Sequence, residues 1–89
     1  MAANTATNRG NHSIGIVERD TGIGRDTLRI WERRYGFPEP GRNDKGERVY
    51  SESQLRRLQR VRRLLDQGLR PGKVLPLGED ALRRLEVSL

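Results

Sequence analysis

Apolar residues recur at helical spacing in two neighbouring segments near the start of the chain, with a glycine turn between them. The first segment predicts a short helix over about 14–21 that ends at Gly22. The second predicts a helix over about 24–34, with charged residues on the side opposite its apolar stripe. Two helices joined by so short a turn are typical of a helix-turn-helix. The residues expected to be buried from the second helix are Thr27, Leu28 and Trp31.

Proline and glycine end the second helix, and an alternating segment follows. The sequence Tyr-Gly-Phe-Pro-Glu-Pro over 35–40 excludes further helical hydrogen bonding. Residues 42–46 have the composition of a hairpin turn and 47–50 alternate as a strand does, so we predict a small two-stranded wing over 39–50. Such a hairpin is unstable alone and must pack on the helices. The residues expected to make this contact are Phe37, Val49 and Tyr50.

The last part of the chain has the most regular helical pattern. Residues 51–54 fit a Ser-x-x-Gln capping box, and leucine and valine then recur at helical spacing until Gly68 ends the helix. A proline in the first position predicts a short helix over about 71–75, and 79–89 form a weaker amphipathic helix. We therefore expect a mainly α fold, a winged helix-turn-helix with about four helices and a small two-stranded β wing.

Small size and a polar start limit the core. The chain has 89 residues, of which 33% are hydrophobic and 34% charged, which allows one small domain. We expect a disordered tail over 1–12, a folded domain over 13–77, and a C-terminal extension or the start of a linker over 78–89.

Several classes of chemistry are excluded by residues that the sequence lacks. There are no cysteines, and the single histidine falls in the predicted tail, which removes disulfides, zinc–cysteine sites and thiol catalysis. The carboxylates show no pairing for general acid and base work, and the glycines lack the order of a phosphate loop. We therefore expect no enzyme activity, metal or cofactor in this chain. No apolar run is long enough to span a bilayer or to form a secretory signal, so we expect a cytoplasmic protein with no membrane partner.

The charge of the chain favours a polyanionic partner. The formal net charge is +6, the sequence pI is about 11.0, and arginine dominates the 18 basic residues. A guanidinium suits bidentate contacts with phosphate and guanine, but composition does not separate DNA from RNA, and an ordinary solvated surface is the alternative. The solvated surface is favoured over a second phosphate-binding surface for most of the arginines in the helix after the capping box, namely Arg56, Arg57, Arg60, Arg62 and Arg63.

Short signatures dispersed along the chain carry a family resemblance. They are Ile14-Gly15, Val17, Thr21-Gly22-Ile23, Thr27-Leu28-Arg29, Trp31-Glu32-Arg33, Gly46 and Arg48-Val49-Tyr50-Ser51. Together they resemble the DNA-binding domain of the MerR family of regulators over about 14–75. Residues 31–36 and the later Gly-Leu-Arg-Pro-Gly-Lys-Val resemble in particular its light- or cobalamin-responsive CarA, CarH and LitR branch.

The resemblance implies a bacterial transcriptional regulator that binds an inverted-repeat, double-stranded operator in the nucleoid. It implies a homo-oligomer for a full-length regulator, with a cobalamin-type effector domain in some members, whereas this chain alone is expected to be a monomer. Nothing after Leu77 is long enough to hold a cofactor. An excised domain and a stand-alone short homologue are both compatible with the sequence. The resembling branch favours a repressor, although the sequence does not fix the sign of regulation.

Charged residues of the second helix and of the wing are the candidate DNA contacts. We expect the helix over 24–34 to lie in the major groove and the wing over 39–50 on the backbone or in the minor groove. Arg25 and Arg29 are the leading base or phosphate contacts, because arginine can bind guanine O6 and N7 together. For Asp26, a favourable interaction with the helix dipole is preferred over accepting a hydrogen bond from cytosine. The other candidates are Arg33, Arg34, Tyr35, Arg42, Lys45 and Arg48.

The aromatic residues have structural as well as DNA-binding interpretations. Trp31 is expected to anchor the core rather than stack on a base, because it lies at helical spacing from Leu28. The Tyr35 hydroxyl either donates to a phosphate or caps the core. Tyr50 is assigned mainly to packing.

Three positions depart from the usual family pattern, namely Glu18, the pair Ile30-Trp31 and Glu47. Glu18 is a candidate partner for an arginine of the second helix, which it would hold back from DNA. Arg33 or Arg34 has Glu18 or Glu32 as an alternative partner. Glu47 argues against a stacking contact at the tip of the wing.

Two other functions stay open at this point. The arginine-rich surface would also suit an acidic protein that mimics DNA, because phosphate and carboxylate arrays make similar demands on arginine. An excisionase-like architectural protein would bend DNA with little preference for a half-site.

Overall fold

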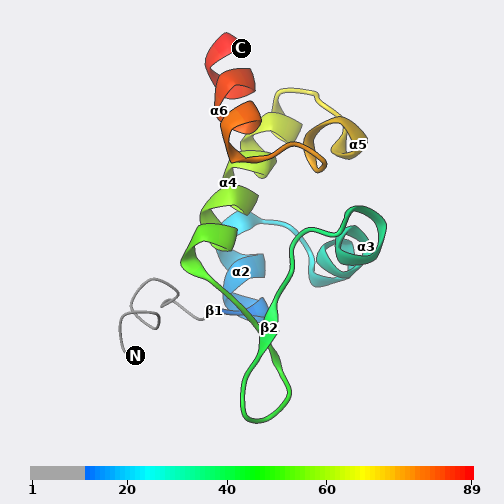
Figure 1. The fold of residues 1–89 in the computed structure, drawn as a ribbon, viewed down its shortest axis with the longest axis vertical. Coiled ribbons are helices and arrows are strands. Elements are labelled where there is room, and N and C mark those ends of the chain that lie inside the picture. Colours follow the sequence, from blue (N-terminus) through cyan, green and yellow to red (C-terminus); the bar gives the residue numbers. More distant parts are fainter. Residues whose placement is uncertain (1–11) are drawn as a thin grey trace.

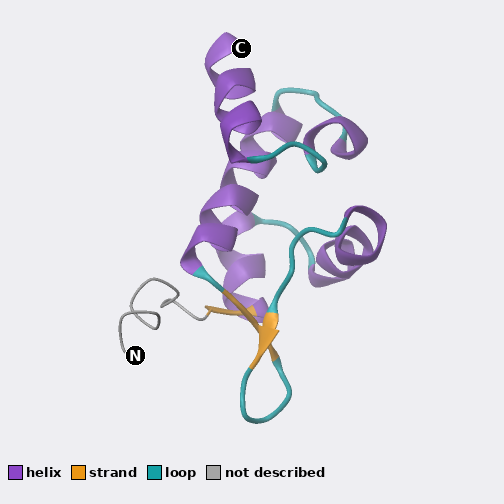
Figure 2. Ribbon diagram, in the orientation of Figure 1, coloured by secondary structure: helices purple, strands orange, loops and turns teal. Residues whose placement is uncertain are grey.

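The computed structural model describes residues 12–89, and this part contains five helices and a small sheet that lies at one end of the molecule (Figures 1 and 2). The elements in chain order are β1 (His12–Ser13), α2 (Ile14–Thr21), α3 (Arg25–Tyr35), β2 (Gly41–Arg42), β3 (Arg48–Tyr50), α4 (Glu52–Asp66), α5 (Pro71–Val74) and α6 (Glu79–Ser88). The mainly α winged helix-turn-helix is thereby confirmed. Residues 1–11 of the predicted tail lie outside the described part. No helix in the described part has both the length and the apolar character needed to cross a membrane.

Glycine caps set the ends of α2 and α3 close to the predicted positions. Gly22 and Gly36 adopt left-handed φ angles of 75° and 73°, and each donates its backbone N–H to a carbonyl one turn earlier. Leu28 and Trp31 are buried as expected, but the burial predicted for Thr27 is wrong, because this side chain is exposed. Only a narrow stripe of α3 faces the core, and Thr27 lies outside it in the first turn.

The wing contains the two predicted strands and gains a third from the start of the described part. The strand order is β1-β3-β2, all antiparallel, with His12 opposite Tyr50 and Arg42 opposite Arg48. His12, which the sequence placed in the tail, belongs to this sheet, and its ring nitrogen lies 2.7 Å from Glu52. That hydrogen bond lowers the pKa of the Glu52 carboxyl.

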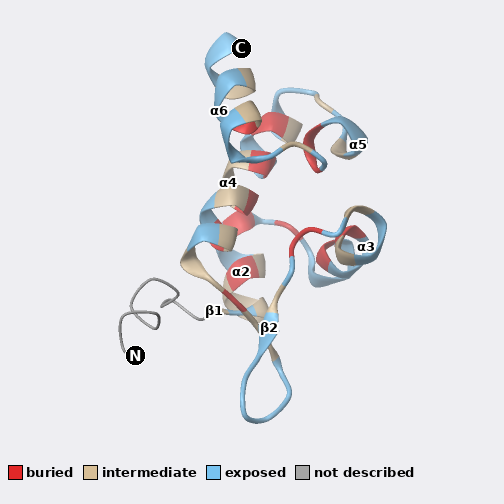
Figure 3. Cartoon of the chain, viewed as in Figure 1, coloured by how far each residue is buried: buried red, intermediate tan, exposed pale blue. Residues whose placement is uncertain are grey.

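Helix α4 runs through the middle of the molecule, with α2 packed near one end and α6 near the other (Figure 1). Its apolar side, formed by Leu55, Leu58, Val61 and Leu64, is the centre of the core (Figure 3). Phe37 and Tyr50 are buried as predicted, and Val49 is half-buried. Leu82 of α6 is fully buried, so residues 79–88 complete the same core.

The expected capping box at the start of α4 forms only in part. Ser51 Oγ accepts a hydrogen bond from the Gln54 backbone N–H at 3.2 Å, as a cap should. The Gln54 side chain does not reach back to Ser51. It accepts from the backbone N–H of Glu39 at 2.6 Å and donates to the Glu39 carbonyl at 3.1 Å, which fixes the start of the wing to α4.

Several arginines of α4 hold α6 in place. Arg60 contacts Glu79 at 2.7 Å and Glu86 at 2.9 Å, and Arg63 contacts Glu86 at 2.6 Å, which lowers the pKa of the Glu86 carboxyl. Arg57 donates to the Leu77 carbonyl, and its guanidinium lies 3.9 Å from the centroid of the Phe37 ring. The solvated surface predicted for most of these arginines does not include Arg57 and Arg60, which are half-buried against groups of a distant segment. The exposed members are Arg56, Arg62 and Arg63.

Candidate nucleic-acid interface

Helix α3 stands to one side of the molecule with its outer surface open to solvent (Figures 1 and 3). Successive residues of an α-helix are rotated by about 100°, so the buried Leu28 and Trp31 define an opposite, outward side. That side carries Asp26, Ile30 and Arg33, all of them exposed. The predicted exposure of the charged side of this helix, including Arg29, is confirmed.

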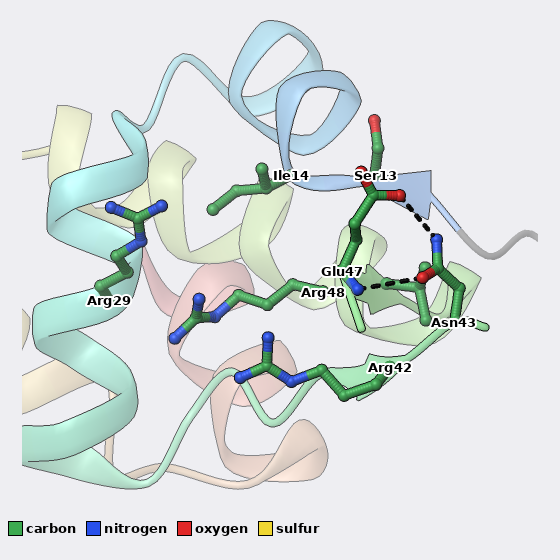
Figure 4. Close-up of a pocket in the computed structure, with 8 residues that line it drawn as sticks. Ser13, Ile14, Arg29, Arg42, Asn43, Glu47 and Arg48 are labelled. Atoms are coloured by element: carbon green, nitrogen blue, oxygen red, sulfur yellow. Dashed lines mark hydrogen bonds between the residues drawn. The ribbon is translucent and has the colours of Figure 1, made fainter. Parts of the chain in front are cut away.

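A hollow of about 400 Å³ separates α3 from the wing and gathers three arginines. Arg29 reaches it from α3, while Arg42 and Arg48 reach it from the two strands of the wing hairpin. Figure 4 shows the three guanidinium groups turned toward the same space. The remaining residues that line the hollow are Ser13, Ile14, Asn43, Glu47 and Val49. Three guanidinium groups around this hollow outnumber the single carboxylate among the described residues that line it, Glu47, so the hollow is suited to an anion such as a phosphate group.

Glu32 of α3 organises the wing side of this hollow. Arg48 Nε lies 3.3 and 3.2 Å from the two Glu32 oxygens, and the Tyr50 hydroxyl donates to Glu32 Oε2 at 3.2 Å. Burial, and then the negative charge of Glu32, raise the pKa of Tyr50 to about 12. Arg48 is 26% exposed and Glu32 16%, so this contact is partly shielded from water. The alternative pairing of Arg33 or Arg34 with Glu32 is not observed.

Glu18 of α2 binds Arg25 at the start of α3. This agrees with the expectation that Glu18, which departs from the usual family pattern, pairs with an arginine of the second helix. Its Oε1 accepts from Nε and Nη2 of Arg25 at 3.3 Å, and its Oε2 accepts from the Arg25 backbone N–H at 3.3 Å. Gly24, the N-cap residue of α3, has no side chain to supply that cap. Arg25, expected to be a leading DNA contact, is therefore turned toward α2.

The other candidates on α3 are held more loosely. Arg29 lies 3.7 Å from Asp26 one turn earlier, and the two side chains are 46% and 92% exposed. Arg33 and Arg34 are exposed on the last turn, with the Arg34 guanidinium 5.9 Å from the centroid of the half-buried Tyr35 ring. These side chains can reorient toward a ligand at little cost.

The tip of the wing is shaped by Asn43. Its Oδ1 accepts from the backbone N–H groups of Lys45 and Glu47, each at 2.9 Å, and its Nδ2 donates to Glu47 Oε1 at 2.9 Å. Arg42 donates to the Gly46 carbonyl at 3.1 Å, where Gly46 has a φ of 77°. Lys45 is exposed at the tip of the turn, whereas Glu47 is hydrogen-bonded to the Asn43 side chain.

Sequence analysis did not predict the contacts of two residues that shape this surface, namely the Glu32 contact with Arg48 and the hydrogen bonds of Asn43 within the turn. Asn43 carried a usable signal, because asparagine at the start of a turn commonly accepts from the backbone two residues on. Glu32 carried little signal, since its partner Arg48 lies 16 residues away on another element.

Comparison with known proteins finds related sequences over the same part of the chain. Residues 12–74 match the family described as "MerR HTH family regulatory protein". The chain is similar to the HTH-type transcriptional repressor CarA of Myxococcus xanthus, with 47% identity over 55 residues that cover 61% of this chain and 19% of CarA. It is similar to the HTH-type transcriptional regulator MlrA of Escherichia coli (strain K12), with 36% identity over 63 residues that cover 71% of this chain and 26% of MlrA.

A third relative extends the match toward the end of the chain. The HTH-type transcriptional repressor CarH of Myxococcus xanthus is 30% identical over 78 residues, which cover 88% of this chain and 26% of CarH. The chain thus spans about a quarter or less of the length of these relatives. Because the family match takes in both helices, the wing and the arginines between them, the chain belongs to the MerR HTH family of regulatory proteins.

Proposed function

We propose that this chain is the sequence-reading domain of a transcriptional regulator, with α3 in the major groove and the wing on the adjoining phosphates. The observation that carries the proposal is the hollow between α3 and the wing, where Arg29, Arg42 and Arg48 converge. A phosphate held there would lie beside the outward side of α3. The base edges of the neighbouring pairs would then face that side, as in helix-turn-helix docking.

The proposal divides the candidate residues by role. Arg29 binds a guanine or the phosphate next to it, while Arg33 and Arg34 bind bases or phosphates further along the groove. Arg42, Lys45 and Arg48 grip the backbone, and Tyr35 donates to a phosphate from the end of α3. Asp26 orients Arg29, from which it lies 3.7 Å. Arg25 contributes least, because Glu18 engages its guanidinium.

We further propose repression as the regulatory outcome and a homo-oligomer as the full-length form. Two similar proteins, CarA and CarH, are named repressors, whereas MlrA is named only a regulator. A homo-oligomer would pair two such domains on an inverted repeat, with half-sites about 34 Å apart. We expect such a regulator to act in the cytoplasm, on the nucleoid.

The test is selection of duplexes from a random library by the purified chain at moderate salt, followed by sequencing. We expect one enriched half-site, with the same site enriched by the control variant Arg83→Ala, which alters an exposed arginine of α6 away from α3. Binding without enrichment would contradict sequence reading. Failure to retain any duplex would contradict the DNA-binding role of this surface.

A further inference from the structure

Ile30 is a large apolar side chain exposed on a helix whose other exposed side chains are polar or charged. It is 45% exposed, and the other exposed large hydrophobic residues in the described part, Val87 and Leu89, lie at the end of the chain. A single exposed isoleucine is ordinary on a protein surface and needs no explanation by itself. Its position on α3 is what makes it informative.

Ile30 occupies the middle of the outward side of α3. Asp26 lies four residues before it and Arg33 three residues after it, spacings that put all three on one side of a helix. Leu28 and Trp31 face the core from the other side, with exposures of 0% and 5%. Any partner seated on the outward side of α3 therefore covers Ile30, whose apolar surface then loses its contact with water.

The major groove offers one apolar group to such a side chain. Base edges present hydrogen-bond donors and acceptors, and an isoleucine placed against them leaves those groups unpaired. Thymine alone among the four standard bases also carries a methyl group, at C5, which an aliphatic side chain can cover without that penalty. The polar neighbours Asp26 and Arg33 cannot provide this contact.

A more specific inference about Ile30 rests on the proposed function. From these observations we infer that Ile30 is a specificity-determining residue, which selects thymine at one base pair of each half-site by packing on its C5 methyl group. Ile30 contributes an apolar contact with the methyl group, whereas the arginines contribute charged contacts with phosphates and polar base edges of the same groove. Loss of one buried methyl group corresponds to a change of about fourfold in affinity.

Deoxyuridine tests the inference, because it differs from thymidine only by this methyl group. In a duplex enriched by the chain, each thymidine is replaced in turn by deoxyuridine and the Kd is measured for the wild type, Ile30→Ala and the control Ile30→Val. We expect one position per half-site at which replacement weakens wild-type binding about fourfold. Ile30→Val should keep most of this penalty, and Ile30→Ala should reduce it to less than about twofold.

The outcomes separate this inference from the proposed function. An enriched duplex in which no thymidine is sensitive, or in which the penalty persists in Ile30→Ala, overturns the role of Ile30 and leaves sequence reading intact. Failure to enrich any duplex overturns the proposed function, and the inference with it. Circular dichroism of Ile30→Ala should match the wild type, because the side chain is exposed and alanine favours a helix.

Discussion

The Glu32 carboxylate lies 3.2 Å from Arg48 Nε and so joins the middle of α3 to the strand β3 of the wing. The same carboxylate accepts from the Tyr50 hydroxyl, so three side chains fix the distance between the helix and the hairpin. Because the Glu32 carboxylate holds α3 and the wing at a fixed spacing, the two elements would contact DNA in one preferred register. The contact also turns the terminal nitrogens of Arg48 toward Arg29 and Arg42 (Figure 4).

Glu32→Gln should reduce the preference for the selected duplex over scrambled duplexes more than it reduces affinity for DNA in general. The change removes the ion pair with Arg48 but keeps the shape of the side chain, and we expect it to cost about 1–2 kcal/mol of stability. Affinity for unrelated duplexes should hold or rise, because a negative charge near the phosphates is lost. The Kd ratio between selected and scrambled duplexes should therefore fall. Glu79→Gln, which alters an ion pair between α4 and α6, should leave that ratio unchanged; a fall of equal size there would refute the special role of Glu32.

Stability should decline in strong alkali because of Tyr50. Its pKa is raised from 10.0 to about 12 in the folded chain, so above pH 10 the unfolded chain loses this proton first. The stabilisation is thus complete below pH 10 and is lost as the pH rises toward 12, by about 2 kcal/mol. Urea unfolding at several pH values should show this loss in the wild type and in Tyr35→Phe, but not in Tyr50→Phe. If the stability of Tyr50→Phe falls with pH as that of the wild type does, Tyr50 is not the cause of the loss.

Glu18→Gln should increase affinity for duplexes of any sequence. It releases the Arg25 guanidinium, which then becomes available to a phosphate at the start of α3. The slope of log affinity against log salt should steepen by about 0.9, the value for one added phosphate contact. Asp20→Asn removes a charge from the same helix without freeing Arg25 and should change the slope much less. Equal slopes for Glu18→Gln and wild type would show that Arg25 stays away from DNA for another reason.

Leu82→Ala should destabilise the whole domain by about 3 kcal/mol. Leu82 of α6 is fully buried in the core that α6 shares with α4, and loss of a buried leucine side chain costs roughly 2–5 kcal/mol. Val87→Ala, on the same helix but 86% exposed, should change the free energy of unfolding by less than about 0.5 kcal/mol. Chemical denaturation of both variants gives the comparison. If Leu82→Ala unfolds like the wild type, α6 is not part of the cooperative unit.

Local signals explain which parts of the fold the sequence predicts. Gly22 and Gly36 mark helix ends by their left-handed backbone and Ser51 marks one by its side-chain oxygen, and the structure places the ends within a residue or two of the predictions. Strand β1 has only two residues, too few for any periodic pattern, so His12 could not be assigned to it. The exposed Thr27 shows that helical spacing does not give the width of the buried stripe.

Long-range pairing limits prediction of the candidate site. The sequence identified the arginines of α3 and of the wing by residue type, and it raised the Glu18 contact because that residue departs from the family pattern. It did not reveal that Arg48 contacts Glu32, or that Arg60 contacts Glu86 at a separation of 26 residues. Which arginines stay free for a ligand depends on these pairs, and they form only when distant elements pack together.

We propose that α3 recognises the base sequence and that the wing binds the DNA backbone. The most direct test of this division is duplex selection run in parallel with wild type, Arg29→Ala and Lys45→Ala. Arg29 lies on α3 and Lys45 at the exposed tip of the wing. We expect Arg29→Ala to lose the preference at one position of the half-site. We expect Lys45→Ala to enrich the wild-type sequence with uniformly lower affinity. The same altered preference in both variants, or an unaltered preference in Arg29→Ala, would contradict sequence reading by α3.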